Sequence, residues 1–498
     1  GQGTRTPIAI TLLVKNPKAK QHGQIYWHDI GDYLNHKKKL EIINGFKSID
    51  GVNTANEWKQ IKPDEYNDWI NQRDNSFYEF IKIGDKKNRS STNIFINYSS
   101  GLKTSRDVWC YNFSKESLVL NMNNMISFYQ SELARFSAVY KELNTEKTPI
   151  IDDFINTDLT KISWNRGLKN DLSKQNSLSY KPESIIVSLY RPFSKQWAYF
   201  DKDFNDMVYQ MHKLFPISEA KNRVIYLSGI GNAGKSPSAL IVDALPDLNM
   251  QHSGGQGFPL YLYEKADTEQ TSNADLFANP DNQQNTQEYT KKDAISDEGL
   301  THFQEAYPSE SFSKEDIFYY IYGLLHSPEY RDRYADNLTK ELPRIPCVKT
   351  AKDFWAYSKA GRDLAELHIN YETVDCYPVT LEENGELLFG DESYYVTKMK
   401  FIKKDDKTAV VYNNHITIKD IPLEAYDYIV NGKPALEWVM ERQVVTTDKK
   451  SGIVNDANLW ATETMGNAKY PLELFQRVIT VSLETMKIVN ALPELDID

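Results

Sequence analysis

Two short patterns in the sequence combine residue types that could bind a nucleotide or a metal ion. The segment Gly229–Ser236 (GIGNAGKS) matches GxxxxGK[ST], in which backbone amides, Lys235 and Ser236 would hold phosphates and magnesium. A working loop of this kind opens a long helix, but here Pro237 follows at once. We therefore expect Gly234, Lys235 and Ser236 to lie in an ordinary turn, and we keep an autonomous P-loop enzyme as the alternative function.

The second pattern resembles a nuclease metal site. Pro63-Asp64 followed by Asp85-Lys86-Lys87 fits a PD…DxK arrangement, in which two carboxylates and a lysine could bind magnesium. The spacing rule is so loose that we expect a solvated charge cluster instead. The sequence also lacks the Asp/Asn-Pro-Pro-aromatic tetrad of amino-methyltransferases and a paired-histidine zinc motif. We predict no catalytic, cofactor-binding or metal-binding residue in this chain.

Basic residues in the segment GLKTSRDVWCYNF (residues 101–113) could contact DNA. Lys103, Thr104 and Arg106 fall in a predicted turn before a strand that carries Trp109 and Tyr111. Lysine and arginine bind phosphates, and an arginine fork also matches the two acceptors of guanine in the major groove. The alternative is a surface turn with an Arg-Asp pair.

The segment YRPFSKQWAYFD (residues 190–201) interleaves cations with aromatic residues, a composition that suits nucleic-acid contact. We expect Trp197 and Tyr199 to face the core, which leaves Arg191 and Lys195 available. Arg223 lies in the same half of the chain and is a weaker candidate. The predicted DNA-binding set is therefore Lys103, Thr104, Arg106, Arg191, Lys195 and Arg223.

The distribution of charge favours DNA contact by the first half. The chain carries a net charge of -11, but residues 1–250 hold 33 Lys and Arg against 27 Asp and Glu. The remaining residues hold 25 against 42. Such asymmetry suggests that a polyanion would contact the first half, although acidic residues could also simply keep a helical second half in solution.

Hydrophobic periodicity predicts an α+β fold with a mixed-sheet region and a mainly helical end. We expect a buried strand at residues 8–14, a helix that starts at Lys37–Lys39, strands at 183–190, 195–201 and 222–229, and an amphipathic helix at 119–143. Helices follow around Ser327-Pro328, where proline should break them. Because the first apolar run reads as a buried strand with no initiator Met before it, we expect the chain to be a fragment.

The polar stretch 266–292 is rich in Asn, Gln, Asp and Thr, and we predict a linker or insertion there. The predicted parts are residues 1–55, 56–265, 266–292 and 293–498. No run approaches the ~20 apolar residues of a membrane span. Three widely spaced cysteines fit a reducing cytoplasm.

An ordered series of segments resembles the C-terminal specificity region of type ISP restriction-modification enzymes. The series includes TRTPIAITLLVKNP, IYWHDIGDYLNHKKKL, GLKTSRDVWCYNFS, SLYRPFSKQWAYFD, GFPLYLYE, the stretch EDIFYYIYGLLHSPEYRDRYADNLTKELPRIP and IPLEAYDYIVNGKPALEWVMER. The resemblance implies that residues 1–55 are the last strands of an adenine methyltransferase domain, that residues 56–265 form a target-recognition region, and that residues 293–498 form a helical specificity domain.

The resemblance also implies that this chain recognises double-stranded DNA. Upstream methyltransferase, translocase and nuclease domains would then use S-adenosylmethionine, ATP and magnesium. Besides the P-loop enzyme, a scaffold that binds no DNA remains a rival. It predicts no salt-dependent DNA affinity, whereas a DNA binder loses affinity steeply as salt rises.

Overall fold

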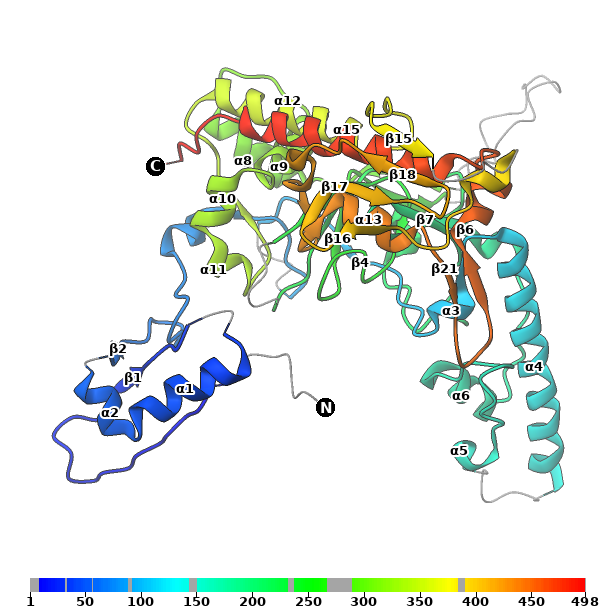
Figure 1. The fold of residues 1–498 in the computed structure, drawn as a ribbon, viewed down its shortest axis with the longest axis horizontal. Coiled ribbons are helices and arrows are strands. Elements are labelled where there is room, and N and C mark those ends of the chain that lie inside the picture. Colours follow the sequence, from blue (N-terminus) through cyan, green and yellow to red (C-terminus); the bar gives the residue numbers. More distant parts are fainter. Residues whose placement is uncertain are drawn as a thin grey trace. The chain divides into compact units, whose positions relative to one another are not determined.

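A computed structural model of the chain describes residues 9–31, 34–55, 57–87, 92–142, 150–231, 237–266, 289–383 and 390–497. The chain divides into two compact units, Gly1–Asp74 and Asn75–Asp498 (Figure 1). This division differs from the predicted parts. The first unit extends past residue 55 to Asp74, and the rest of the chain is a single unit.

The first unit contains a two-stranded ladder and two helices. β1 (Ile25–Trp27) pairs antiparallel with β2 (Lys59–Ile61), and α1 (His36–Phe46) and α2 (Ile49–Thr54) lie between them in the sequence. The Asn35 side chain accepts a hydrogen bond from the Lys38 amide and so caps α1. The helix start predicted at the lysine run is confirmed.

The buried strand predicted at residues 8–14 is wrong for its described part, residues 9–14. This stretch forms no strand, and Ile10, Leu13 and Val14 are 78%, 90% and 88% exposed. Among the described residues of the unit, Val52 is the one buried hydrophobic side chain. Apolar composition indicates a tendency to be buried, but a strand also needs a neighbouring strand, and this unit supplies none there.

Two four-stranded sheets form the centre of the second unit. The first has the order β10 (Leu245–Pro246), β6 (Ile185–Arg191), β7 (Ser194–Tyr199) and β5 (Tyr111–Asn112). The second has the order β4 (Ser99–Ser100), β11 (Gln256–Pro259), β8 (Val224–Leu227) and β9 (Ala239–Val242). All neighbours are antiparallel except β10 and β6. The strands predicted at residues 183–190, 195–201 and 222–229 are confirmed.

Further strands complete an α+β architecture. A third sheet has the order β15 (Thr380–Glu383), β18 (Ile416–Lys419), β17 (Asp406–Val411) and β16 (Lys400–Lys403). Two-stranded ladders join β3 (Ile81–Lys82) to β14 (Arg344–Ile345), β12 (Tyr261–Lys265) to β13 (Tyr289–Asp293), β19 (Ile429–Val430) to β20 (Lys433–Pro434), and β21 (Val445–Thr447) to β22 (Val454–Asp456).

The polar stretch 266–292 connects two strands that pair with each other. β12 and β13 align from Tyr261↔Asp293 to Lys265↔Tyr289, while residues 267–288 lie outside the described residues. One hydrophobic core extends across both sides of this stretch. The Phe258 ring stacks on Tyr98 at 4.8 Å, and Phe95 contacts Phe318 at 6.3 Å between ring centres. The stretch therefore falls within a single unit.

Helices form most of the remainder. They are α8 (Asp297–Ala306), α9 (Lys314–Leu324), α10 (Pro328–Arg333), α11 (Ala335–Leu338), α12 (Ala351–Ile369), α13 (Ala435–Arg442), α14 (Ala457–Leu459) and α15 (Tyr470–Asn490). A capping box between Ser313 and Asp316 starts α9, and Pro328 occupies the first turn of α10. The predicted break at Ser327-Pro328 is confirmed.

Two glycines bring α9 and α12 into close contact. A Cβ atom at Gly361 would overlap the carbonyl oxygen of Tyr319, and one at Gly323 would overlap that of Tyr357. The helix backbones therefore touch where each glycine faces the other helix. Around this contact, Tyr320 stacks on Phe354 with ring centres 4.8 Å apart.

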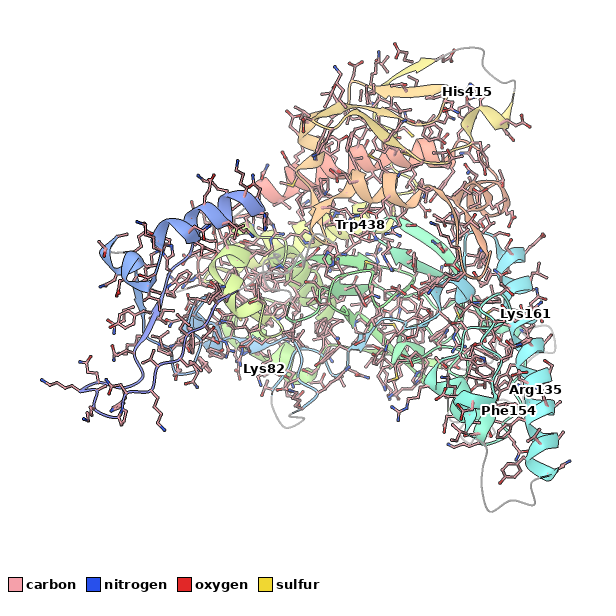
Figure 2. All side chains as sticks on the ribbon, turned by 60° about the horizontal axis from the view of Figure 1, so that its bottom comes forward. Lys82, Arg135, Phe154, Lys161, His415 and Trp438 are labelled. Atoms are coloured by element: carbon pink, nitrogen blue, oxygen red, sulfur yellow. The ribbon has the colours of Figure 1, made fainter. Side chains whose placement is uncertain are left out.

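A helical arm has its own hydrophobic cluster within the second unit. α4 (Lys115–Glu142), α5 (Ile151–Phe154) and α6 (Arg166–Ser173) contribute to this cluster, together with Tyr199 of β7. Figure 2 labels Arg135 and Phe154 where α5 packs on α4, with the guanidinium 3.7 Å from the ring centre. The amphipathic helix predicted at residues 119–143 is confirmed by α4.

The nucleotide-binding alternative requires a helix after the glycine-rich loop, and a strand follows instead. β8 pairs antiparallel with β9 from Val224↔Val242 to Leu227↔Ala239. Gly234, Lys235 and Ser236 lie outside the described residues. Because the pattern sits in the connection of a β-hairpin, the context for phosphate binding at a helix N-terminus is missing.

None of the described helices is both long enough and apolar enough to cross a bilayer.

Replacement of Gly361 by alanine should destabilise the second unit by at least about 2 kcal/mol, because the added methyl group overlaps a buried backbone carbonyl. Urea unfolding followed by circular dichroism would measure this loss. Gly167→Ala in α6 is the matched control, since its Cβ would lie 3.4 Å from Asn165 Oδ1, an ordinary contact. Equal stability of the two variants would contradict the close helix contact.

Candidate nucleic-acid interface

The predicted turn at Lys103–Arg106 is a loop that neighbouring segments hold in place. The amide of Lys103 donates to the Met207 carbonyl at 3.0 Å, and the Met207 amide donates back at 3.0 Å. On the other side, the Leu248 amide donates to the Leu102 carbonyl at 2.8 Å. The Thr104 hydroxyl accepts from the Arg106 amide at 3.1 Å, at the start of the short helix α3 (Asp107–Cys110). The loop is therefore rigid by hydrogen bonding.

The buried side chain of Asp247 joins this loop to the first sheet. Its carboxylate accepts hydrogen bonds from Arg191 Nη1 at 2.7 Å, the Asn249 amide at 2.8 Å and the Tyr111 hydroxyl at 3.1 Å. The Tyr226 hydroxyl donates to its carbonyl at 3.1 Å. Burial raises the pKa of Asp247 to about 6, although the charge of Arg191 opposes this rise.

A cavity of about 320 Å³ opens beside the loop, and we call it the Arg106 pocket. Its lining consists of Leu102, Lys103, Thr104, Ser105, Arg106, Asp107, Asp247, Leu248 and Asn249. Cations, carboxylates and hydroxyl groups meet there, so the pocket offers both donors and acceptors to a ligand.

The two cations of the pocket differ in their surroundings. Lys103 Nζ lies 2.6 Å from Asp206 Oδ2, and its side chain is 43% exposed. Arg106 is only 4% exposed, and burial lowers the pKa of its guanidinium. Within the described part of the chain, none of the guanidinium nitrogens of Arg106 has a hydrogen-bond partner.

The three other predicted cations form ion pairs within the chain. Arg191 pairs with Asp247 and lies 3.9 Å from the Tyr190 ring centre. Lys195 pairs with Glu372 at 2.7 Å, and its side chain is 15% exposed. Arg223 pairs with Glu366 of α12 at 2.6 Å.

The structure therefore divides the predicted residues into two groups. Lys103, Thr104 and Arg106 line one pocket, and Arg191 reaches it through Asp247, whereas Lys195 and Arg223 pair with acidic residues elsewhere. The expectation that Arg191 and Lys195 are available is wrong, because they pair with Asp247 and Glu372 and their side chains are 14% and 15% exposed. Arg106 is buried as well. That any of the six residues binds DNA stays a prediction.

Comparison with known families identifies the family of this chain. Residues 93–475, more than half of its length, match the family model described as the type ISP C-terminal specificity domain. The chain belongs to the type ISP family.

Solved structures agree with this assignment. The ATP-dependent type ISP restriction-modification enzyme LlaBIII bound to DNA is 38% identical, with a TM-score of 0.79 over 96% of this chain. A nuclease-deletion mutant of the type ISP enzyme LlaGI in complex with a DNA substrate mimic is 33% identical over 95%, with a TM-score of 0.79. The DrdV–DNA complex is 29% identical over 95%, with a TM-score of 0.76. No curated protein matches the chain significantly.

The chain is shorter than these structural relatives. It spans 28% of the LlaBIII chain, 39% of the LlaGI chain and 43% of the DrdV chain. The comparisons therefore concern one part of a longer kind of polypeptide.

A β-hairpin of this type ISP domain, with two lysines at its turn, is an element that the sequence reasoning missed. The hairpin β21–β22 is held against β5, because Asn112 Nδ2 donates to the Val454 carbonyl at 3.0 Å. Asp448 caps the hairpin turn through the Ser451 amide at 2.7 Å. Lys449 and Lys450 are exposed there. The Asp-Lys-Lys-Ser-Gly turn signal could have revealed it.

The described residues of the type ISP domain contain no group of three His, Cys, Asp or Glu side chains that could hold a metal ion. The buried histidines have other roles, since His368 Nδ1 and Nε2 hydrogen bond to the Tyr322 hydroxyl at 2.6 Å and the Thr485 hydroxyl at 2.8 Å.

Asp247 should make stability fall as pH rises from about 4 to 7. Its folded pKa of about 6 exceeds the unfolded value of 3.8, so the folded state holds the proton more tightly in this range. The unfolding free energy of the wild type minus that of Asp247→Asn should therefore decrease by up to about 3 kcal/mol between pH 4 and 7. Urea unfolding at a series of pH values measures it.

A pH-independent difference for Asp247→Asn would show that its carboxyl group does not titrate as described.

Proposed function

We propose that this chain is the DNA target-recognition part of a type ISP restriction-modification polypeptide. The match of residues 93–475 to the specificity domain carries the proposal, and the solved relatives that bind DNA support it. In this proposal, upstream domains of the same polypeptide methylate adenine and cleave DNA with ATP, and the present chain directs them to the site. S-adenosylmethionine, ATP and magnesium would bind to those domains.

The hairpin β21–β22 supports DNA contact by its shape and charge. The major groove of B-form DNA admits a two-stranded β-ribbon, and this ribbon carries the two exposed lysines Lys449 and Lys450 at its turn. The Asn455 side chain hydrogen bonds to Gln196 of β7 at 3.1 Å and fixes the ribbon to the first sheet. A fixed ribbon loses little conformational freedom on binding.

The first unit supports the proposal of an upstream partner. Its described residues bury a single hydrophobic side chain, while Ile49, Trp69 and Ile70 are 54%, 50% and 48% exposed. Exposed apolar side chains in such number mark an interaction surface. We propose that residues 1–55 belong to an adenine methyltransferase domain whose upstream part covers these side chains.

The location proposed for the protein is the cytoplasm. The cysteines Cys110, Cys347 and Cys376 are free thiols, and free thiols are typical of proteins in reducing compartments.

Selection from a library of randomised duplexes should enrich one asymmetric sequence when this chain is the bait. The enriched duplex should bind more tightly than a scrambled duplex of equal length in a competition titration. For both duplexes, log affinity should fall with log salt by about 0.9 per neutralised phosphate. Absence of both enrichment and salt-dependent binding would favour the scaffold that binds no DNA.

Replacement of Lys449 and Lys450 by alanine should lower the salt slope by up to about 2 and weaken binding to the enriched and scrambled duplexes alike, if both lysines contact phosphates. The control Lys359→Ala/Lys487→Ala removes two lysines that are 76% and 75% exposed on α12 and α15. Fluorescence anisotropy with labelled duplexes at several salt concentrations measures the slopes. Identical slopes for the two double variants would remove the hairpin from the interface.

A further inference from the structure

Arg106 differs from the other buried side chains without partners because all three of its guanidinium nitrogens lack one. Its side chain is buried and its guanidinium donates no hydrogen bond to any described residue. A buried charge without a partner destabilises a folded protein. Its presence therefore indicates a role other than stability. The Arg106 pocket lies next to this charge, so a ligand in the pocket could interact with it.

Asp206 lies within electrostatic reach of both cations of the pocket. Its Oδ2 atom binds Lys103 Nζ at 2.6 Å and accepts from the Ser105 hydroxyl at 3.0 Å. Lys103, Ser105 and the charge of Arg106 all lower the pKa of Asp206, the hydrogen bond from Lys103 most. Lys103 pairs with Asp206, while the charge of Arg106 acts on this carboxylate without a hydrogen bond, so the three side chains retain one net positive charge.

We propose that the Arg106 pocket binds one phosphate group of DNA by exchange of charge partners. Lys103 leaves Asp206 to bind the phosphate at the pocket mouth, and Arg106 then compensates the charge of Asp206. The inference rests on the proposed function, because it takes DNA as the source of the phosphate.

Exposure decides which cation contacts the ligand. The Lys103 side chain is 43% exposed, whereas the guanidinium nitrogens of Arg106 are buried. Release of a lysine from its carboxylate normally leaves an uncompensated negative charge. Here Arg106 is already in place to offset it, so the exchange removes an obstacle to phosphate binding.

The other carboxylates of the pocket are engaged elsewhere. Asp107 accepts hydrogen bonds from the hydroxyl groups of Thr104 and Tyr190. Asp247 is paired with Arg191. The positive charge of Arg191 therefore reduces the repulsion between Asp247 and an incoming phosphate.

The variants Lys103→Met and Arg106→Met test the exchange in the full chain. Each should lower the salt slope for a labelled duplex by about one unit, because each abolishes the same phosphate contact. The double variant should lose no more than either single variant, which is the sign of two residues acting through one contact. Arg106→Met should also raise the melting temperature, since it removes an unpaired buried charge.

Two control variants match the test residues. Lys419 is 40% exposed and pairs with Glu382 at 2.7 Å, much as Lys103 pairs with Asp206. Burial lowers the pKa of Arg331, as it does for Arg106, and Arg331 lines a different cavity. Neither Lys419→Met nor Arg331→Met should change the salt slope.

The outcomes separate this inference from the proposed function. Additive slope losses in the double variant would mean that Arg106 contacts a second phosphate, and the exchange would be wrong. If the salt slopes of Lys103→Met and Arg106→Met equalled those of the controls while the wild type bound DNA, the pocket would not bind phosphate. The proposed function would remain. If inorganic phosphate stabilised the wild type but not Lys103→Met, and the chain bound no DNA, then DNA would not be the source of the phosphate.

Discussion

The buried carboxylate of Asp247 is the constraint on which the candidate interface depends. It binds Arg191 of β6, the hydroxyl of Tyr111 in β5 and the backbone of the segment that follows β10. Its carbonyl also accepts from Tyr226 of β8, which belongs to the second sheet. A single residue therefore fixes both central sheets and the pocket loop to one another. The shape of the pocket follows from this junction.

The acidic character of the second half acquires a structural meaning. Glu366 and Glu372 lie in that half and bind Arg223 and Lys195 of the first half. Part of the positive charge of residues 1–250 is thus paired with acidic residues within the protein. The charge that remains for a polyanion is concentrated in fewer positions than composition indicates, which favours selective contact over a uniformly basic surface.

Elements with strong periodicity could be predicted from the sequence. α4, β6, β7 and the break before α10 follow from apolar spacing and from proline. The exposed, non-strand conformation of residues 9–14 could not, because an apolar run predicts a buried strand whether or not the fold places another strand beside it. The same limit applies to the first unit, whose boundary depends on contacts between residues far apart.

Residue types in the candidate site could be predicted, but their surroundings could not. Sequence reasoning selected Lys103, Arg106 and Lys195 for their charge. Their burial and pairing depend on residues that are distant in the sequence. Glu372 is 177 residues from Lys195, and the backbone pairing of Lys103 with Met207 places Asp206 beside Lys103. No local pattern encodes such contacts, so burial of Arg106 became visible only in three dimensions.

The length of α4 has a consequence for how a duplex could lie along the arm. With 28 residues at about 1.5 Å each, the helix extends roughly 42 Å. One turn of B-form DNA measures about 34 Å. Lys115 in its first turn and Lys141 in its last turn are therefore separated by slightly more than one helical repeat. A rod of that length, parallel to a duplex, crosses one major and one minor groove, so its two ends would lie at the same strand one turn apart.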